Sequence, residues 1–334
     1  WPMRFHLSEE QIAIQDAVRG TLADNWSMDH LHKFADSESD FDQPSWDSLM
    51  ALGLAGILSP DSGMGLLDAA LVSEVAGEAA AAGPLIGQML AVAAVSRSSS
   101  DAARAHLDAL AEGTSIATLA LGDSAYVPCA KAAHFFLTDT RDGALSLVEA
   151  GDGVSIEAVR STDRSRPVSQ VCFDGAKTHE LFAAGDPMVA KLFDSALVLI
   201  AADALGGAQK CTDMSVAYAK EREQFGQPIG QFQALKHQLA QMALEVEPAR
   251  AQLWYAAYAH DAELDDAPRA AAMAKAHLCD VYVRTARAAV AAHGGIGYTW
   301  EYGLNYWFRR AAFDRAWLGS PAEHRARAAD LAGW

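Results

Sequence analysis

The sequence predicts a mainly α chain with a small β domain in its middle. Three observations lead to this fold class. Apolar residues recur at helical spacing through the first third of the chain. Short β-rich runs between turn residues follow, and long helical segments with short connections then continue to the end. We therefore expect three domains, at residues 1–112, 113–185 and 186–334.

The first expected domain, residues 1–112, is all-helical. A capping box, the pattern that starts a helix, runs from Ser8 to Gln11. The apolar residues that follow it recur at helical spacing: Ile14, Val18 and Leu22. Further helical patterns span residues 46–52, the alanine-rich stretch that runs from Leu66 and ends before Gly83-Pro84, and residues 102–111. We expect no secretory signal before the first helix, and we expect Met3 to be the natural start.

The second expected domain, residues 113–185, has a sequence pattern typical of a small antiparallel barrel or sandwich. Its apolar runs are short and are separated by turns such as Arg-Asp-Gly and Gly-Asp-Gly. The expected strands are residues 115–121, 134–138, 144–149, 154–159 and 168–173. Helical spacing returns after Gly185. The third domain is therefore expected to be an antiparallel bundle with helices near residues 188–220, 230–261, 268–292 and 304–332.

Composition narrows the classes of function. The 334 residues carry a formal net charge of -17, which argues against nucleic-acid binding because that function needs a basic surface. The apolar runs are too short for membrane insertion. The four cysteines are widely spaced and form no C-x-x-C pair, which indicates isolated buried thiols and a cytoplasmic location. We identify no metal site.

Two segments of the last third carry the most specific signal. The first is Arg222-Glu-Gln-Phe-Gly-Gln-Pro-Ile-Gly-Gln-Phe-Gln-Ala, and the second is His293-Gly-Gly-Ile-Gly-Tyr-Thr-Trp-Glu. The planar guanidinium of an arginine suits a pyrophosphate, and glycines let the backbone lie against a ligand. In this order and separation the two segments resemble the C-terminal half of acyl-CoA dehydrogenases. In that family both segments bind FAD.

The resemblance implies a function and a set of site residues. Its three-domain arrangement matches the family, whose members remove the α-proton and the β-hydride of an acyl-CoA thioester. The family positions that contact the adenine and pyrophosphate end of a neighbouring subunit's FAD are matched here by Arg222, Gln224, Phe225, Gln233, Gly294, Gly295 and Gly297. Ala291 stands where the family commonly has a glutamine, so one contact differs.

The catalytic base of the family is only partly matched. The family places a glutamate either in a Glu-Gly-Thr loop before the last helix or fourteen residues before the first glycine of the second segment. The loop position reads Ala316-Trp-Leu-Gly-Ser-Pro-Ala-Glu-His here, resembling bacterial, often steroid-side-chain-degrading, members. At the other position stands Asp280, which is one methylene shorter. Asp280 is either a weak base or a solvated or paired helix acid.

The middle domain departs furthest from the family. Fully active members hold the isoalloxazine of their own FAD with a Thr-Glu-Pro-x-Ala-Gly-Ser-Asp-like loop and a Trp-x-Thr strand. The corresponding residues 117–126 and 134–138 carry neither signature. The chain thus retains what it contributes to a partner's FAD and lacks what holds its own. The resemblance therefore implies the non-catalytic subunit of a two-plus-two heterotetramer, paired with a second acyl-CoA dehydrogenase subunit.

Alternatives remain open at this stage. The chain could be a self-sufficient homo-oligomeric dehydrogenase that uses Asp280, or a scaffold or acyl-CoA-binding protein without flavin. Arg222 could cap a helix or pair with Glu221 or Glu223, Phe225 and Phe232 could be core residues, and the glycines could only end a helix. His293 is expected to be a buried imidazole without a catalytic role. The family's usual electron acceptor is an electron-transferring flavoprotein, and the acyl group stays unspecified.

Overall fold

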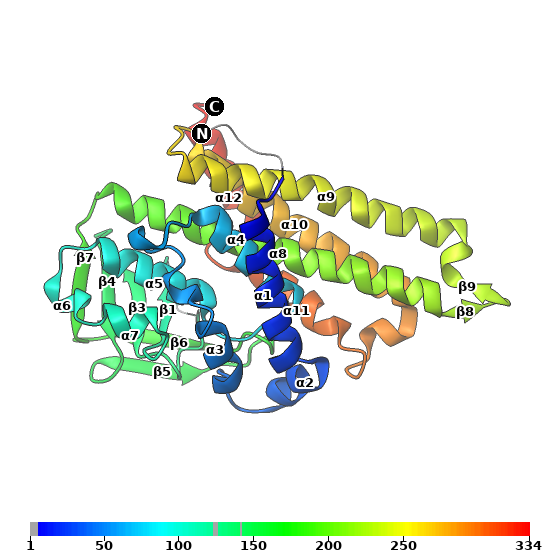
Figure 1. The fold of residues 1–334 in the computed structure, drawn as a ribbon, viewed down its shortest axis with the longest axis horizontal. Helices are drawn as coiled ribbons and strands as arrows, with labels where there is room; N and C mark the ends of the chain where they lie inside the picture. The colour runs from blue at the N-terminus through cyan, green and yellow to red at the C-terminus, as the bar shows by residue number, and fades with distance from the viewer. Residues whose placement is uncertain (1–5, 123–125, 141) are drawn as a thin grey trace.

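The computed structural model describes residues 6–122, 126–140 and 142–334. Met3, the expected start, and residues 123–125 of the middle region lie outside them. The described chain is mainly helical, with its principal strands confined to the middle third (Figure 1). This arrangement confirms the predicted fold class. The two predicted domain boundaries fall in the connections between α7 and β1 and between β7 and α8.

The described part of the N-terminal region, from residue 6 onward, is built from seven α-helices and two short 3-10 turns. Its predicted capping box is confirmed, because the Ser8 side chain accepts a hydrogen bond from the Gln11 backbone and the Gln11 side chain accepts one in return. The helix expected over residues 102–111 is instead two short helices, because the chain breaks at Ala105 and His106. The elements are α1 (Glu9–Asn25), α2 (Met28–Asp36), α3 (Gln43–Met50), the 3-10 turns Leu54–Gly56 and Pro60–Ser62, α4 (Leu66–Glu78), α5 (Leu85–Arg97), α6 (Asp101–Arg104) and α7 (Leu107–Ala111).

The middle region forms a sandwich of two sheets. The four-stranded sheet has the order β1-β3-β4-β7, and the three-stranded sheet has the order β2-β6-β5. Strands β1 and β3 pair in parallel, unlike the antiparallel pairing that was expected throughout. Two strands, β2 and β7, were not predicted. The strands are β1 (Ala117–Ala120), β2 (Tyr126–Pro128), β3 (Phe135–Asp139), β4 (Leu145–Glu149), β5 (Val154–Ala158), β6 (Val168–Phe173) and β7 (Thr178–Phe182).

The four-stranded sheet is buried on both faces. On β3, Phe135 and Leu137 belong to the large hydrophobic core shared with the helices, whereas Phe136 packs in a smaller core between the two sheets. The pleat of a strand sends successive side chains to opposite faces, which explains this division. Helix α5 lies against the β1 edge so closely that a side chain at Gly87 would meet the Thr118 backbone at 2.8 Å.

The C-terminal region is a helical bundle around α8, as predicted. The helix expected over residues 304–332 is divided at Trp317–Ser320, where Leu318 and Gly319 have positive φ angles. A two-stranded hairpin joins α8 to α9 at the narrow end of the molecule (Figure 1). The elements are α8 (Pro187–Glu221), β8 (Glu223–Gln224), β9 (Gln227–Pro228), the 3-10 turn Ile229–Gln231, α9 (Gln233–Asp261), α10 (Ala267–His293), the 3-10 turn Gly294–Tyr298, α11 (Leu304–Ala316) and α12 (Pro321–Leu331).

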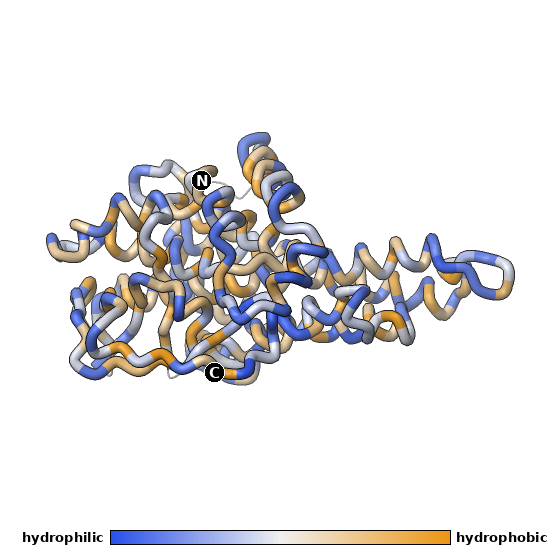
Figure 2. The backbone as a smooth tube through the Cα atoms, turned by 90° about the horizontal axis from the view of Figure 1, so that it is seen from below, coloured by the Kyte–Doolittle hydropathy of each residue, from blue (hydrophilic) through white to orange (hydrophobic). Residues whose placement is uncertain are grey.

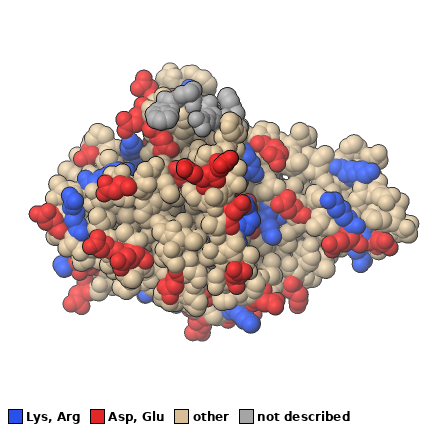
Figure 3. All heavy atoms as spheres, in the orientation of Figure 1, with Lys and Arg blue, Asp and Glu red and all other residues tan. Residues whose placement is uncertain are grey.

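Surface properties follow this layout. Figure 2 shows hydrophilic residues at the tip of the α8–α9 connection, where the chain leaves the bundle. On the face seen in Figure 3, acidic and basic side chains are interspersed, and both kinds reach the narrow end. None of the described helices combines the length and apolar character that a bilayer crossing requires. Cys129, Cys211 and Cys279 are buried as expected, whereas Cys172 is exposed.

Candidate functional site

The hairpin after α8 presents Phe225 to solvent. Gln224 pairs with Gln227, so Phe225 and Gly226 form a two-residue turn in which both φ angles are positive, at 54° and 76°. A non-glycine residue in this region is strained, and such strain concentrates at ligand sites. Phe225 is 93% exposed as a residue, and its ring touches Phe232 edge-on, with ring centroids 6.1 Å apart. Phe225 is therefore not a core residue.

Arg222 follows the last residue of α8 and is exposed. Its backbone N–H donates to the Tyr218 carbonyl, and this bond ends the helix. Its guanidinium forms no hydrogen bond or ion pair with any described residue, so the alternative pairing with Glu221 or Glu223 does not occur. The Gln224 side-chain amide donates only to the Glu223 carbonyl, and Gln233, the first residue of α9, is exposed. These polar groups are free to meet a ligand.

The glycine segment begins where α10 ends. Gly294 has φ 64° and ψ -141°, a conformation that requires glycine. A Cβ added at Gly294 or Gly295 would meet no described atom within 4 Å, so this backbone is open to solvent. Gly297 is different, because a Cβ there would lie 3.0 Å from His293. The absence of a side chain at Gly294 and Gly295 leaves space for a ligand. At Gly297 it instead avoids a clash with His293 of the same chain.

A ring stack brings the two segments together. Tyr218, one helical turn before Arg222, stacks on His293, one residue before Gly294, with ring centroids 4.6 Å apart. His293 Nδ1 donates to the Ala289 carbonyl at 2.7 Å, and its Nε2 accepts from the Tyr302 hydroxyl at 2.9 Å. Burial lowers the pKa of His293, an effect that its hydrogen bonds to backbone groups only partly offset. The His293 imidazole is therefore neutral and buried, and it packs the two segments together. Its burial was expected from the sequence.

Asp280 lies apart from this pair of segments on α10. Its carboxylate binds Arg315 at 2.9 Å and also pairs with Arg325 on α12. Partial burial raises the pKa of Asp280, but the hydrogen bonds and charges of these two guanidiniums outweigh it, so the pKa lies below its ordinary value. A carboxylate held ionised by two cations is a poor proton acceptor. The geometry favours the paired helix acid over the base.

The loop that replaces the family's Glu-Gly-Thr is fixed by the chain's own groups. Lys275 is fully buried, and its ammonium donates to the carbonyls of Asp314 at 2.8 Å and Gly319 at 3.1 Å. His324 Nε2 donates to the Leu318 carbonyl at 2.8 Å. Trp317 and Leu318 are buried. Residues 317–320 of this segment therefore offer packing and backbone contacts, and its one carboxylate, Glu323, caps the start of α12.

A buried ionic network occupies the junction of the middle region and the bundle. Arg166, in the loop between β5 and β6, binds Asp203 of α8 and Asp314 of α11, each at 2.9 Å. Burial and then the Asp203 charge raise the pKa of Asp314 well above its ordinary value. The pKa of Asp203 is lowered, because Arg166 and Arg310 outweigh the opposing effect of its burial. The sequence analysis missed this network because its members are far apart in the chain.

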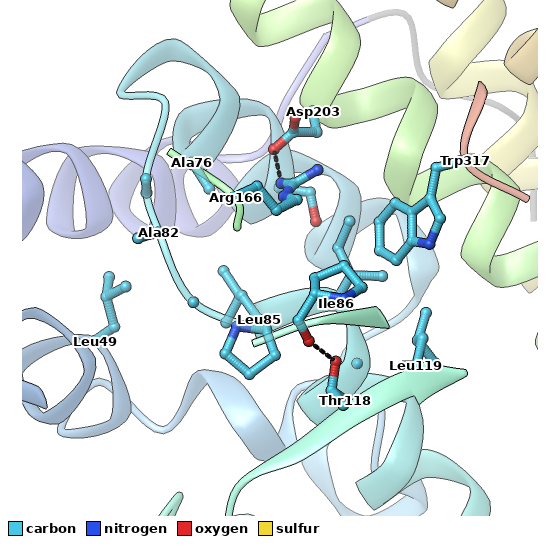
Figure 4. A pocket seen from close by; sticks show the side chains of 16 residues that line it. Leu49, Ala76, Ala82, Leu85, Ile86, Thr118, Leu119, Arg166, Asp203 and Trp317 are labelled. Atoms are coloured by element: carbon cyan, nitrogen blue, oxygen red, sulfur yellow. Dashed lines mark hydrogen bonds and ion pairs between the residues drawn. The ribbon is translucent and has the colours of Figure 1, made fainter. Parts of the chain in front are cut away.

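The space beside this network is small. Arg166 and Trp317 face β1 across a cavity of about 20 Å³, to which Thr118 also contributes (Figure 4). Such a volume holds about one water molecule. Larger clefts lie elsewhere: one of about 390 Å³ between the start of α8 and the four-stranded sheet, and one of about 410 Å³ among α1, α2, α4 and α8.

Comparison with known proteins decides the family. The N-terminal domain of acyl-CoA dehydrogenase matches residues 8–114, and its C-terminal domain matches residues 184–331. Acyl-CoA dehydrogenase IpdE2 of Mycolicibacterium smegmatis is 32% identical over 327 residues, covering 96% of this chain and 98% of the relative. The chain belongs to the acyl-CoA dehydrogenase family. FAD is the cofactor that this membership supports.

Other members of the family resemble the chain over its full length. IpdE2 of Mycobacterium tuberculosis is 31% identical over 320 residues, which cover 94% of this chain and 95% of the relative. A variant of the Tcur3481-Tcur3483 steroid ACAD has a TM-score of 0.87 at 27% identity, covering 97% of this chain and 98% of the other. The ChsE4-ChsE5 complex from Mycobacterium tuberculosis has a TM-score of 0.86 at 25% identity, covering 99% of both chains.

Proposed function

We propose that this chain is the partner subunit of a heteromeric acyl-CoA dehydrogenase. It contributes one side of an FAD site, while a second polypeptide supplies the catalytic base and most of the acyl-CoA pocket. The observation that carries the proposal is the unpaired guanidinium of Arg222 beside the open glycine backbone at Gly294. Arg222 follows α8 and Gly294 follows α10, and the two helix ends are connected through the stacked Tyr218 and His293 rings.

The exposed groups fit one end of a dinucleotide. The Arg222 guanidinium suits a pyrophosphate, the backbone at Gly294 and Gly295 allows close approach, and the Phe225 ring offers a flat apolar face. When bound, FAD supplies the hydride acceptor of the family reaction. This chain's residues hold and orient the cofactor and take no proton from the substrate, because Asp280 is bound by two arginines.

The stretch that would hold the chain's own flavin ring lacks the signature residues of the family. The resemblance places that ring against residues 117–126, and Thr118 and Leu119 from this stretch line the 20 Å³ cavity beside Arg166. The missing Thr-Glu-Pro-type loop and Trp-x-Thr strand therefore support dependence on a partner rather than an autonomous enzyme.

Two of the similar structures bear names that join two proteins, Tcur3481-Tcur3483 and the ChsE4-ChsE5 complex, and the first is called a steroid ACAD. We therefore propose a steroid-derived acyl-CoA as the substrate class. An electron-transferring flavoprotein is the proposed acceptor, and the cytoplasm the proposed location.

The first test compares the chain alone with the chain in complex. Purified alone, it is expected to be colourless. Co-expressed with the acyl-CoA dehydrogenase relatives of its source genome, it is expected to co-purify with one of them as a yellow complex that oxidises an acyl-CoA. A yellow, active preparation of this chain alone would contradict the proposal. A colourless complex would favour a scaffold without flavin.

Arg222→Ala tests the contact itself. Loss of charge-assisted hydrogen bonds to a pyrophosphate costs about 1.5–3 kcal/mol, so the complex should bind FAD about tenfold to a hundredfold more weakly. The measurement is FAD titration into deflavinated complex. Arg104→Ala, at an exposed arginine of α6, is the matched control and should leave FAD affinity unchanged. If the two variants bound FAD with equal affinity, Arg222 would not be part of the FAD site.

A further inference from the structure

Three side chains that can bind a metal converge at the end of the molecule opposite the α8–α9 hairpin. They are His106 at the start of α7, Glu149 at the end of β4 and His179 on β7. One ligand atom from each residue lies within 4.8 Å of the other two. Figure 1 places α6 and β7 far from β8 and β9, so this cluster is separate from the proposed FAD contacts.

The sheet register explains how Glu149 and His179 meet. Leu147 pairs with His179, and the Glu149 N–H donates to the Lys177 carbonyl at 2.9 Å. Because alternate residues of a strand share a face, Glu149, Lys177 and His179 project from the same side of the sheet. The connection between α6 and α7 covers this side. It supplies His106, whose ring packs on Phe135 with centroids 4.8 Å apart.

The two separations from Glu149 are near those of a tetrahedral metal site, and the two histidine nitrogens lie within 4.8 Å of each other. Glu149 Oε1 lies 3.5 Å from His106 Nε2 and 2.7 Å from His179 Nε2. Zinc bonds of about 2.0–2.2 Å at tetrahedral angles separate neighbouring ligand atoms by about 3.3–3.6 Å. The Glu149–His106 distance already fits, and the Glu149–His179 distance must widen by about 0.6–0.9 Å. We propose that His106, Glu149 and His179 bind Zn²⁺, with the fourth position open to solvent.

A cation is already attracted to this place. The Lys177 ammonium lies 2.7 Å from the same Glu149 oxygen, and its side chain is 68% exposed. The same carboxylate oxygen also lies 2.7 Å from His179 Nε2, and a carboxylate binds a metal in its ionised form. The flexible lysine can swing into water and leave its place to a metal ion. The side chain of His179 is only 8% exposed, so one ligand is held firmly by packing.

Zinc at this position would join the helical region to the sheet. His106 belongs to the N-terminal helices, whereas Glu149 and His179 belong to neighbouring strands. A ligand that binds only the folded state stabilises it in proportion to the logarithm of its concentration over Kd. We therefore expect zinc to raise the unfolding temperature without altering FAD binding.

The experiment uses the tag-free, metal-stripped full-length chain. Isothermal titration with ZnCl₂ is expected to give one equivalent, and His106→Gln and His179→Gln should each weaken binding by about 100-fold or more, because each removes a direct ligand. His237→Gln, at an exposed histidine of α9, is the matched control and should bind as the wild type does. Lys177→Gln should bind zinc more tightly, because it removes the competing ammonium.

Thermal unfolding without zinc checks that each variant is folded; His106, 32% exposed in its side chain, is the safer substitution. Loss of binding in both histidine variants, retention in His237→Gln and tightening in Lys177→Gln would support the site. No one-equivalent binding by the wild type, or binding that survives His106→Gln and His179→Gln together, would overturn it. Neither result bears on the FAD contacts, which are measured separately.

Discussion

At the scale of single residues, Asp280 shows how neighbouring charges decide what a carboxylate does. Its position matched a family base, yet Arg315 and Arg325 surround it and lower its pKa. A lowered folded-state pKa contributes stability above the unfolded pKa of about 4, and this contribution is lost as the pH falls through the folded value. The sequence could locate the carboxylate on its helix but could not show partners from α11 and α12.

Asp280→Asn should therefore affect stability rather than turnover. At pH 7 we expect a loss of about 1 kcal/mol in the free energy of unfolding, because two charged partners lose their anion. The loss should shrink as the pH falls below about 4, where the wild-type carboxylate also becomes neutral. Urea unfolding at several pH values measures this, with Asp265→Asn, at an exposed loop position, as the control. A large fall in kcat of the assembled enzyme would instead restore Asp280 as the base.

At the scale of elements, the crossing of α4 and α8 depends on glycine. A Cβ at Gly206 would lie 1.8 Å from the Glu74 carbonyl oxygen, and one at Gly77 would lie 2.1 Å from the Asp203 carbonyl oxygen. Neither backbone can yield without moving a whole helix, because both are buried. The contact lets α8 carry Asp203 into the network at the centre of the molecule.

Gly206→Ala should lower the free energy of unfolding by about 3 kcal/mol or more. The added Cβ would clash with the backbone of α4, and no flexible side chain at the contact can move aside. Gly20→Ala is the matched control, since Gly20 lies inside α1 with no described atom within 4 Å of the added Cβ. That change should stabilise by about 0.5–1 kcal/mol through helix propensity. Both are measured by chemical denaturation. Similar effects from the two alanines would show that α4 and α8 can separate at little cost.

The sequence predicted helices and strands correctly where a periodic apolar pattern was long. It failed where an element was too short to show such a pattern, or where strand pairing depended on distant residues. The predicted segments 188–220 and 268–292 agree closely with α8 and α10, whose long helical periods carry a strong signal. Strand β2 is only three residues long, and the parallel pairing of β1 with β3 depends on contacts distant in sequence. The cluster of His106, Glu149 and His179 could not be predicted for the same reason. Its members are far apart in the sequence and meet only in the folded chain.

At the scale of the whole molecule, one buried network ties the three regions together. Arg166 comes from the middle region, Asp203 and Asp314 come from the bundle, and Arg310 of the bundle donates to the Ala81 carbonyl of the N-terminal helices at 2.7 Å. All four side chains are buried. A buried ion pair does not by itself guarantee net stability, but removing one partner leaves an uncompensated charge. The arrangement fixes the regions relative to one another and fills the junction beside β1.

Arg166→Met tests this tie. The substitution keeps an apolar stem of similar length but leaves Asp203 without its strongest partner, so we expect a loss of about 3–5 kcal/mol in the free energy of unfolding. Arg164→Met, two residues away, is the control: Arg164 pairs with Asp36 at 3.2 Å on the exposed surface, a contact worth about 0–1 kcal/mol. Denaturant unfolding gives both values, and hydrogen exchange should show faster opening of β5 and β6 only in Arg166→Met. Equal losses of stability in the two variants would contradict this expectation. They would show that apolar packing, and not the buried ion pairs, holds the three regions together.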